Sequence, residues 1–593
     1  MDPLQEYSAR RDRRQAEELL LKRQFTNIGN WRLALGIVAL ALAWLSFGAH
    51  KASPYFLFVP VAAFVALVIW HQRIIRTRVL ATRALAYYNN ALSRVQDRWM
   101  GTGSTGDHFR DDGHVYANDL DVFGKGSLFE LLSVARTGPG ERTLADWLLA
   151  PASPTEAAAR QEASKELSSR LDLREDIALL GDDVRSGVHP DKVADWGARP
   201  AVSLPAWLRG AVSFLSIAAI GTFLAFFAHL LPLFPFVLVL ACNFVVMFAL
   251  RERTERIMAG VETPAQDLRI LSLVLARLER ESFESDRLRL IQESLQTNGR
   301  PASRRIARLQ RWMEWLDSND HLLVRIIRPV LLWNEQCSLA IEAWRQENGP
   351  RVGSWLKAVG DFEALSSLAA LTFERPYWTF PELVVGSPMF DGRELRHPLL
   401  QRATCVPNDV ALGRDLRLLI ISGSNMSGKS TLLRAVGLNA VLAWAGAAVP
   451  ASQLTISPLR VGASLRVTDS LQDNRSRFYA EITRLRAIVD LSKQEPTALF
   501  LLDELLSGTN SHDRRIGASA IVRNLVENGA IGFITTHDLA LADIEHDLQG
   551  RAVNAHFEDK IVDGKIEFDY RLRPGVVTRS NALALMRAVG LAV

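Results

Sequence analysis

The chain has 593 residues, which is too long for one ordinary domain and predicts about two to four structural units. Its apolar fraction of 48% is typical of soluble proteins, and its net charge of +4 is too small to demand a nucleic-acid partner. The three cysteines, Cys242, Cys337 and Cys405, are far apart and lack metal-ligand spacing, so we expect a reducing compartment for most of the chain.

Two pairs of apolar segments interrupt this soluble composition. The first pair is Leu33–Ala49 and Tyr55–Trp70, and the second is Gly210–Leu231 and Phe234–Leu250. The first two are close to the lower limit for a membrane-spanning helix, about 17 residues. Arginines flank the outer ends of both pairs, which predicts four spans in the inner (cytoplasmic) membrane with both chain ends in the cytoplasm. The alternative is a buried hairpin of a protein core at each place.

Residues 262–349 are rich in Leu, Arg and Glu and predict long amphipathic helices. Turn residues at Asn298–Pro301 should divide them, and Gly349-Pro350 should end the region. One helix carries four arginines on its predicted side, and these would bind phosphates of nucleic acid or lipid, or simply form a solvated face. The four are Arg304, Arg305, Arg308 and Arg311.

The most informative stretch follows an apolar strand predicted at Leu418–Ile421. Residues 423–430 fit G-x-x-x-x-G-K-[ST], and a helix pattern begins at Thr431, which is the context of a phosphate-binding loop. We expect Lys429 to contact the β- and γ-phosphates of ATP and Ser430 to bind Mg²⁺. The expected nucleotide-binding residues are Gly423, Ser424, Asn425, Met426, Ser427, Gly428, Lys429, Ser430 and Thr431.

Two further strands end in residues suited to ATP hydrolysis. Thr497–Glu504 is an apolar strand that ends in two acids, of which Asp503 should bind Mg²⁺ and Glu504 should activate water. The strand Ile531–Thr536 ends in His537, which should sense the γ-phosphate; the alternative is a simple surface histidine. We therefore expect Glu504, His537 and Lys429 to be the catalytic group.

Two small polar segments lie near these strands. Ser476 precedes a predicted helix, and residues 507–511 follow the acid pair directly. Either segment could approach a phosphate or a second subunit.

Together these motifs resemble the MutS family of ABC-type ATPases. GSNMSGKST resembles the family's phosphate-binding loop, and LLDELLSGTNSHD resembles its D-E-x-x-x-G-T-[ST]-x-x-D segment. Ser476–Glu481 resembles its S-T-F-x-x-E segment, and Thr536-His537 resembles its Thr-His switch. Further likenesses occur at Ser127–Leu144, Asp361–Pro376, Arg396–Pro398, Asn554, His556 and Tyr570–Leu591.

The resemblance implies an ATPase that dimerises through its nucleotide sites, with Ser476 facing the ATP of the other subunit. It also implies DNA binding and a role in mismatch repair. Three departures from the family pattern weaken the expectation of mismatch recognition. A membrane hairpin replaces the mismatch-reading domain, and the helical region is short for a DNA clamp. In addition, Leu505-Leu506-Ser507 stands where the family usually has Ile-Gly-Arg.

The expected fold is therefore an α/β P-loop ATPase domain with an all-α core and lever and two transmembrane hairpins. The function expected is a membrane-anchored, dimeric ATPase that binds DNA; the alternative is a mechanical ATPase acting on a membrane or protein partner. The expected units are a cytoplasmic tail (1–30), a first hairpin (31–71), the first part of the core (72–206), a second hairpin (207–250), a helical lever (251–375) and the ATPase domain (376–593).

Overall fold

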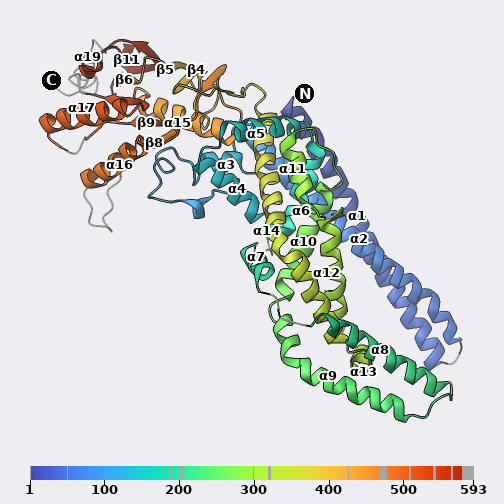
Figure 1. Cartoon of the computed structure of the whole chain (residues 1–593). Helices are drawn as coiled ribbons and strands as arrows, with labels where there is room; N and C mark the ends of the chain where they lie inside the picture. The colour runs from blue at the N-terminus through green and yellow to red at the C-terminus, as the bar shows by residue number, and fades with distance from the viewer. Residues whose placement is uncertain are drawn as a thin grey trace.

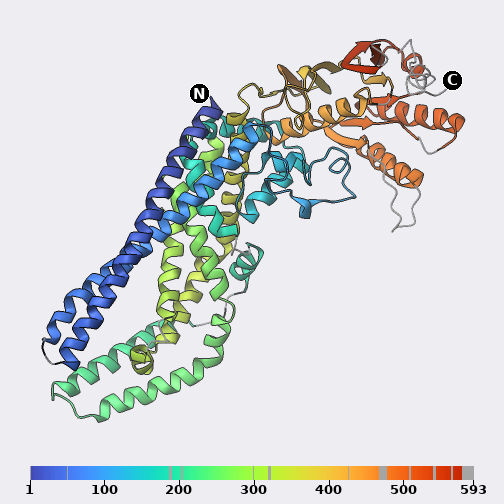
Figure 2. The ribbon, with the colours of Figure 1, turned by 180° about the vertical axis from the view of Figure 1, so that it is seen from behind.

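A computed structural model describes residues 2–49, 51, 53–185, 190–200, 202, 205–297, 299–317, 322–424, 426–465, 477–506, 509–537, 542–562 and 565–576. The molecule is elongated, with its two main sheets at one end and two helical hairpins at the other (Figure 1). Seen from behind, both hairpins again end far from the sheets (Figure 2). The chain is thus mostly helical, with mixed sheets confined largely to its C-terminal part.

The first hairpin is built from α1 (Pro3–Ala43) and α2 (Phe58–Val95), which pack along each other. A π-helical turn (Trp44–Gly48) and a 3₁₀ turn (Pro54–Leu57) lie at its tip. The polar segment expected at residues 1–30 is therefore part of a long helix. Asp2 fixes its start by accepting a hydrogen bond from the Leu4 backbone N–H at 3.1 Å.

The second hairpin consists of α8 (Ala206–Phe227) and α9 (Phe234–Met258). The four hairpin helices are long and apolar enough to cross a membrane, as judged by length and composition. Only 6–17% of each apolar stretch is buried within the described chain. Neither pair is therefore a buried core hairpin there.

A group of helices connects the hairpins to the sheets. Ser127, Thr137 and Ser153 begin three of them by capping a backbone N–H with the side-chain oxygen. A small two-stranded ladder, β1 (Gln296–Thr297) with β2 (Arg300–Pro301), coincides with the predicted break. The helices are α3 (Leu128–Leu132), α4 (Gly138–Leu149), α5 (Pro154–Ser168), α6 (Leu171–Arg185), α7 (Pro190–Ala198), α10 (Glu262–Leu278), α11 (Asp286–Ser294), α12 (Ala302–Asp317) and α13 (Leu322–Leu331).

The longest helix, α14 (Trp333–Glu374), runs through this group. Its 42 residues correspond to a length of about 60 Å. The predicted boundary at Gly349-Pro350 is wrong, because α14 continues through both residues. A β-carbon on Gly349 would lie 2.3 Å from the carbonyl oxygen of Gly197 in α7, so the glycines allow two backbones to meet. This packing outweighs the usual helix-breaking effect of the pair.

The four arginines of α12 do not form one surface. Arg305 is buried, and its Nη1 donates to Glu347 Oε1 at 2.9 Å and Asn348 Oδ1 at 2.8 Å, both on α14. The other three, Arg304, Arg308 and Arg311, are exposed. The predicted grouping of all four on one side is therefore wrong, and one of them ties α12 to α14.

The C-terminal part contains two sheets. The larger has the strand order β12-β11-β6-β10-β9-β8, parallel except for the β11–β12 pair; the smaller has the order β3-β7-β4-β5. The three strands predicted around residues 418, 498 and 531 are confirmed as β6, β9 and β10. The strands are β3 (Glu382–Leu383), β4 (Met389–Leu395), β5 (Asn408–Gly413), β6 (Leu418–Ser422), β7 (Gln453–Ile456), β8 (Arg460–Ser464), β9 (Ala498–Leu502), β10 (Ile531–Thr536), β11 (Ala552–Val562) and β12 (Lys565–Pro574).

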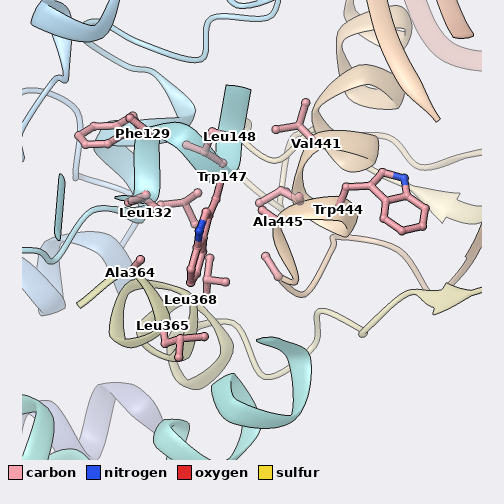
Figure 3. Packing of buried hydrophobic residues seen from close by; sticks show 14 of the residues in the cluster. Phe129, Leu132, Trp147, Leu148, Ala364, Leu365, Leu368, Val441, Trp444 and Ala445 are labelled. Atoms are coloured by element: carbon pink, nitrogen blue, oxygen red, sulfur yellow. The ribbon is translucent and has the colours of Figure 1, made fainter. Parts of the chain in front are cut away.

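Helices α15 (Lys429–Ala445), α16 (Arg477–Leu491), α17 (Ser511–Glu527) and α19 (Ile544–Asp547) accompany these strands. One side of α15 packs against the strands, and another side packs against other helices. Its residues Val441 and Trp444 belong to one buried cluster with Trp147 and Leu148 of α4 and Leu368 of α14 (Figure 3). A continuous apolar core therefore joins the sheet region to the long helix.

The base of the first hairpin is fixed to the end of α14 by a buried ion pair. Arg94 donates to both carboxylate oxygens of Glu374, at 2.8 Å and 2.6 Å, and both side chains are almost inaccessible. Arg375, the next residue, donates to Asp97 Oδ1 at 2.5 Å. The partners of this ion pair are 280 positions apart in sequence, so it links the first hairpin directly to α14.

We expect Glu374→Ala to destabilise the full chain by about 3–5 kcal/mol, because Arg94 would stay buried without a counter-charge. The thermal unfolding midpoint in detergent measures this. As a matched control, Asp547→Ala breaks a half-exposed pair with Arg523 and should change stability by less than about 1 kcal/mol. Replacing both partners, Arg94→Met with Glu374→Leu, should restore much of the loss. Equal effects of the two alanine variants would contradict the assignment.

Candidate functional site

The predicted catalytic residues meet at one edge of the large sheet. Strands β6, β10 and β9 are parallel neighbours, so their carboxyl ends lie together. The loop after β6 contains Lys429, the loop after β9 contains Glu504, and His537 follows β10. Residues that are about a hundred positions apart are thereby placed within hydrogen-bonding distance.

The loop after β6 turns directly into α15. Gly428 has a φ of 103°, a left-handed conformation that suits glycine. A β-carbon at this position would lie 3.1 Å from the Tyr570 ring. Glycine therefore meets both a conformational and a packing requirement, and it directs the first backbone N–H groups of α15 into the site.

Lys429 is buried, and its ammonium group lies inside the loop. Its Nζ donates to the carbonyl oxygens of Gly423 and Ser424, both at 2.8 Å, and lies 3.3 Å from His537 Nε2. Burial lowers the pKa of Lys429, while the nearby Glu504 and Asp503 carboxylates act in the opposite direction. The lysine is thus a partly desolvated cation held at the carboxyl edge of the sheet.

Glu504 and His537 form a close pair. His537 Nε2 lies 2.6 Å from Glu504 Oε1. One ring nitrogen cannot donate to Glu504 and accept from Lys429 at the same time, so a protonated Nε2 pairs with the carboxylate. Glu504 has a φ of 48°, an uncommon conformation for a residue with a side chain and one that is often found at functional sites.

Asp503 is positioned by Thr535 of β10. The Thr535 hydroxyl donates to Asp503 Oδ1 and accepts from the Glu504 backbone N–H at 3.2 Å. The turn beyond is held by Glu481 of α16, which accepts from the Leu506 N–H at 2.6 Å. Thr535 is not among the predicted site residues; its place next to the Thr536-His537 pair is the signal that could have indicated it.

The loop has polar groups suited to a phosphate chain and a magnesium ion. The side-chain oxygens of Ser424 and Ser427 are buried and make no hydrogen bond within the described part of the chain. Buried hydroxyls normally have partners, so this pair fits a ligand with acceptor oxygens. The Ser430 hydroxyl and Asp503 carboxylate are oxygen ligands of the kind Mg²⁺ prefers.

A cavity of about 500 Å³ opens beside the loop. Among its lining residues are the predicted Met426, Ser427, Gly428, Lys429, Ser430, Thr431 and Glu504. Sequence reasoning did not assign a role to three other lining residues, His397, Asn408 and Tyr570. Asn408 joins β5 to β12 by donating to Tyr570 O at 3.0 Å and accepting from Leu572 N at 2.7 Å. Asn408 and Tyr570 reach the site only because these two strands, from different sheets, approach each other.

Some predicted residues lie outside the described part of the chain. These are Asn425 of the loop, Ser476 before α16, and positions 507 and 508 after the acid pair. Their expected contacts with nucleotide or a second subunit remain predictions.

The buried side chain of His397 makes the stability of the folded chain depend on pH. Burial, and to a lesser extent the Arg434 guanidinium, lowers the pKa of His397 to about 4. An unfolded chain would protonate this histidine near its ordinary pKa of about 6.5. The unfolded state therefore binds more protons than the folded state between these values, and stability falls as the pH drops through this interval.

We expect His397→Asn to remove this contribution, which amounts to about 3 kcal/mol between pH 6.5 and 4. In the unmodified chain, His397 Nδ1 accepts a hydrogen bond from the Leu399 N–H at 3.2 Å. The asparagine side chain keeps an acceptor for this N–H. Unfolding midpoints over this pH range provide the measurement, with His546→Asn, at an exposed position, as the control. If the pH slopes of both variants match that of the unmodified chain, the assignment to His397 is wrong.

Comparison with known proteins finds relatives of the part of the chain that contains this site. The family model for MutS domain V matches residues 419–592. An endonuclease MutS2 of Thermomicrobium roseum is 35% identical over 209 residues, which is 34% of this chain and 25% of that protein. A DNA mismatch repair protein MutS 2 of Halobacterium salinarum is 33% identical over 252 residues, 41% of this chain and 28% of that protein.

A DNA mismatch repair protein MutS of Geobacillus thermodenitrificans is 29% identical over 267 residues, 43% of this chain and 28% of that protein. The chain thus spans about a quarter of the length of the curated relatives it matches. The matched segment contains the loop, the acid pair and the Thr-His pair described above. Residues 419–592 of this chain therefore match the MutS family in its domain V.

Proposed function

We propose that the chain hydrolyses ATP with Mg²⁺ at the carboxyl edge of the large sheet. The observation that carries this is the convergence of two side chains on one ring nitrogen: His537 Nε2 lies 3.3 Å from Lys429 Nζ and 2.6 Å from Glu504 Oε1. A cation, a carboxylate and a histidine at the start of a helix form a phosphate-binding and water-activating group. Bound Mg²⁺ would neutralise charge on the phosphates, and Ser430 and Asp503 would hold it.

Each residue then has a distinct role. Lys429 would exchange its two carbonyl partners for phosphate oxygens, aided by the N–H groups of α15. Glu504 would orient and deprotonate the attacking water, and His537 would hold the Glu504 carboxylate in place. The cavity bounded by His397 and Tyr570 would accept the rest of the nucleotide, since it is adjacent to the loop and partly aromatic.

We expect Lys429→Ala to abolish nucleotide binding, because the buried cation that faces the phosphates is lost. Glu504→Gln should bind ATP but hydrolyse it about 10²–10⁴-fold more slowly, since an amide cannot accept the proton from water. Nucleotide binding and single-turnover hydrolysis by the full chain provide the two readouts. Lys493→Ala removes an exposed lysine that pairs with Asp490 and should leave both unchanged. Undiminished turnover by Glu504→Gln would refute the proposed role.

For the rest of the chain we propose the units set out from the sequence, with the two hairpins as membrane anchors. Support comes from the apolar stretches of the hairpins, which are at most 17% buried and lie at the end opposite the sheets (Figure 2). A cytoplasmic ATPase domain and an inner-membrane location follow from the arginine flanks. A homodimer in which Ser476 contacts the partner's nucleotide rests on the family likeness alone.

Two cargoes fit this protein. One cargo is DNA, because one relative is named an endonuclease and two are named DNA mismatch repair proteins. The hairpins favour a membrane cargo, since the tips of both lie at the end of the molecule opposite the sheets. In either case ATP turnover at the sheet would act through α14.

We propose that duplex DNA binds, without preference for a mismatch, and that its affinity falls steeply with salt. Each neutralised phosphate contributes a slope of about −0.9 to log K against log salt. Fluorescence anisotropy of the detergent-purified chain with matched and mismatched duplexes provides the test. A preference for the mismatched duplex would contradict this proposal and favour the role in mismatch repair that the family likeness implies. Absent binding, or binding that ignores salt, would reject DNA and leave a membrane or protein partner as the cargo.

A further inference from the structure

The helix α13 joins α14 at a break that lies against the second hairpin. Leu332, the residue between them, has a φ of 47°, which turns the chain out of one helix and into the next. Apart from two arginines, α13 consists of apolar residues and one proline, in the sequence LLVRIIRPVL. At ten residues it is too short to cross a membrane.

Polar side chains of the hairpin satisfy the carbonyl groups that the break leaves open. Asn243 of α9 is fully buried and donates to the carbonyl oxygens of Pro329 at 3.0 Å and Val330 at 3.1 Å. Ser216 of α8 donates to Leu331 O at 2.8 Å, and Gln336 of α14 donates to the Ser216 hydroxyl at 3.0 Å. The end of α13 is therefore fixed to both helices of the hairpin.

These contacts set the depth of α13. At about 1.5 Å per helical residue, Ser216 lies about 9 Å beyond Gly210, where the apolar part of α8 begins. By the same measure Asn243 lies about 10 Å inside the other end, Leu250. Leu332 also packs with Val212 and Leu250. The end of α13 thus lies within the apolar part of the hairpin, on the side from which both helices enter.

The direction of α13 suits a position parallel to a membrane surface. It is seen end-on in Figures 1 and 2, whereas α8, α9 and α14 are seen from the side, so it runs across all three. Ile327 on this helix is 46% exposed, a large apolar side chain on an outer face. Trp315 and Trp333 lie close by, joined by a hydrogen bond from Trp333 Nε1 to Trp315 O at 2.7 Å, and tryptophans favour the membrane interface.

We propose that α13 lies in the cytoplasmic leaflet of the membrane as an in-plane helix, with Ile327 in contact with lipid. The inference rests on the proposed membrane function of the hairpins and adds a fifth membrane element, which holds the start of α14. The partner surface is the boundary between headgroups and acyl chains, since short amphipathic helices bind there through their apolar faces. The sequence of α13 contains two arginines, at positions 325 and 328, and positive charge suits an anionic membrane surface.

Spin labels at three positions of the full chain in lipid nanodiscs test this inference. The background carries Cys242→Ser, because Cys242 is the exposed one of the three cysteines. Labels replace Ile327 of α13, Phe244 of α9 and Ala307 of α12, all of which are exposed. Collision with oxygen, which concentrates in lipid, is compared with collision with a water-soluble nickel chelate.

We expect oxygen to dominate at positions 244 and 327, and the nickel chelate to dominate at 307. If 244 is in lipid but 327 is in water, α13 is a cytoplasmic helix and the inference fails alone. A label at 244 that meets the nickel chelate overturns the membrane proposal together with this inference. If 327 meets neither reagent, a protein surface such as a second copy covers it, and lipid contact is again rejected.

A second variant examines the cause of this depth. Asn243→Leu removes the donor to Pro329 and Val330 and replaces it with an apolar side chain of similar size. We expect the label at 327 to gain nickel accessibility in this variant, while the label at 244 stays unchanged. An unchanged label at 327 would show that the side-chain amide does not hold α13 at this level.

Discussion

The packing of α4 between α14 and α15 is the contact on which the rest of the structure depends. Helix α15 begins with Lys429 of the phosphate-binding loop, and it reaches α14 through the apolar cluster around Trp147. The start of α4 is held by Glu363 of α14, which accepts hydrogen bonds from the Thr137 backbone N–H at 3.1 Å and from its hydroxyl. Gly140 leaves space for this carboxylate, since a β-carbon there would overlap with it.

The same contact has an electrostatic component. Burial raises the pKa of Glu363 to about 7, although the hydrogen bonds from Thr137 and Arg136 favour the charged carboxylate. A carboxylate at a helix N-terminus also interacts favourably with the helix dipole. From this point α14 extends to two separate attachments, the Arg94–Glu374 pair at one end and the α13 joint at the other. The long helix α14 therefore connects the loop after β6, through α15 and α4, to both hairpins.

The sequence was most informative where local pattern and chemistry coincide. The strands before Lys429, Glu504 and His537 could be predicted because each is a short apolar run followed by a segment that carries a reactive side chain. Gly349-Pro350 shows the opposite case, because the close approach of Gly197 from α7 keeps the helix intact. Tyr570 and Asn408 could not be assigned either, since their places depend on how two strands of different sheets approach each other. The joint at Leu332 likewise follows from tertiary contacts with Asn243 and Ser216 rather than from any local signal.

The two carbonyl bonds of Lys429 have a consequence for ligand selection. An ammonium group that is already solvated by Gly423 and Ser424 gains little from a weak or solitary anion, because each new contact replaces an existing one. Only a ligand with several charged oxygens, which also reaches the hydroxyls of Ser424 and Ser427, offers a net gain in hydrogen bonds. In the proposed ATPase, the backbone oxygens of the loop would therefore set a minimum number of contacts for any ligand that displaces them.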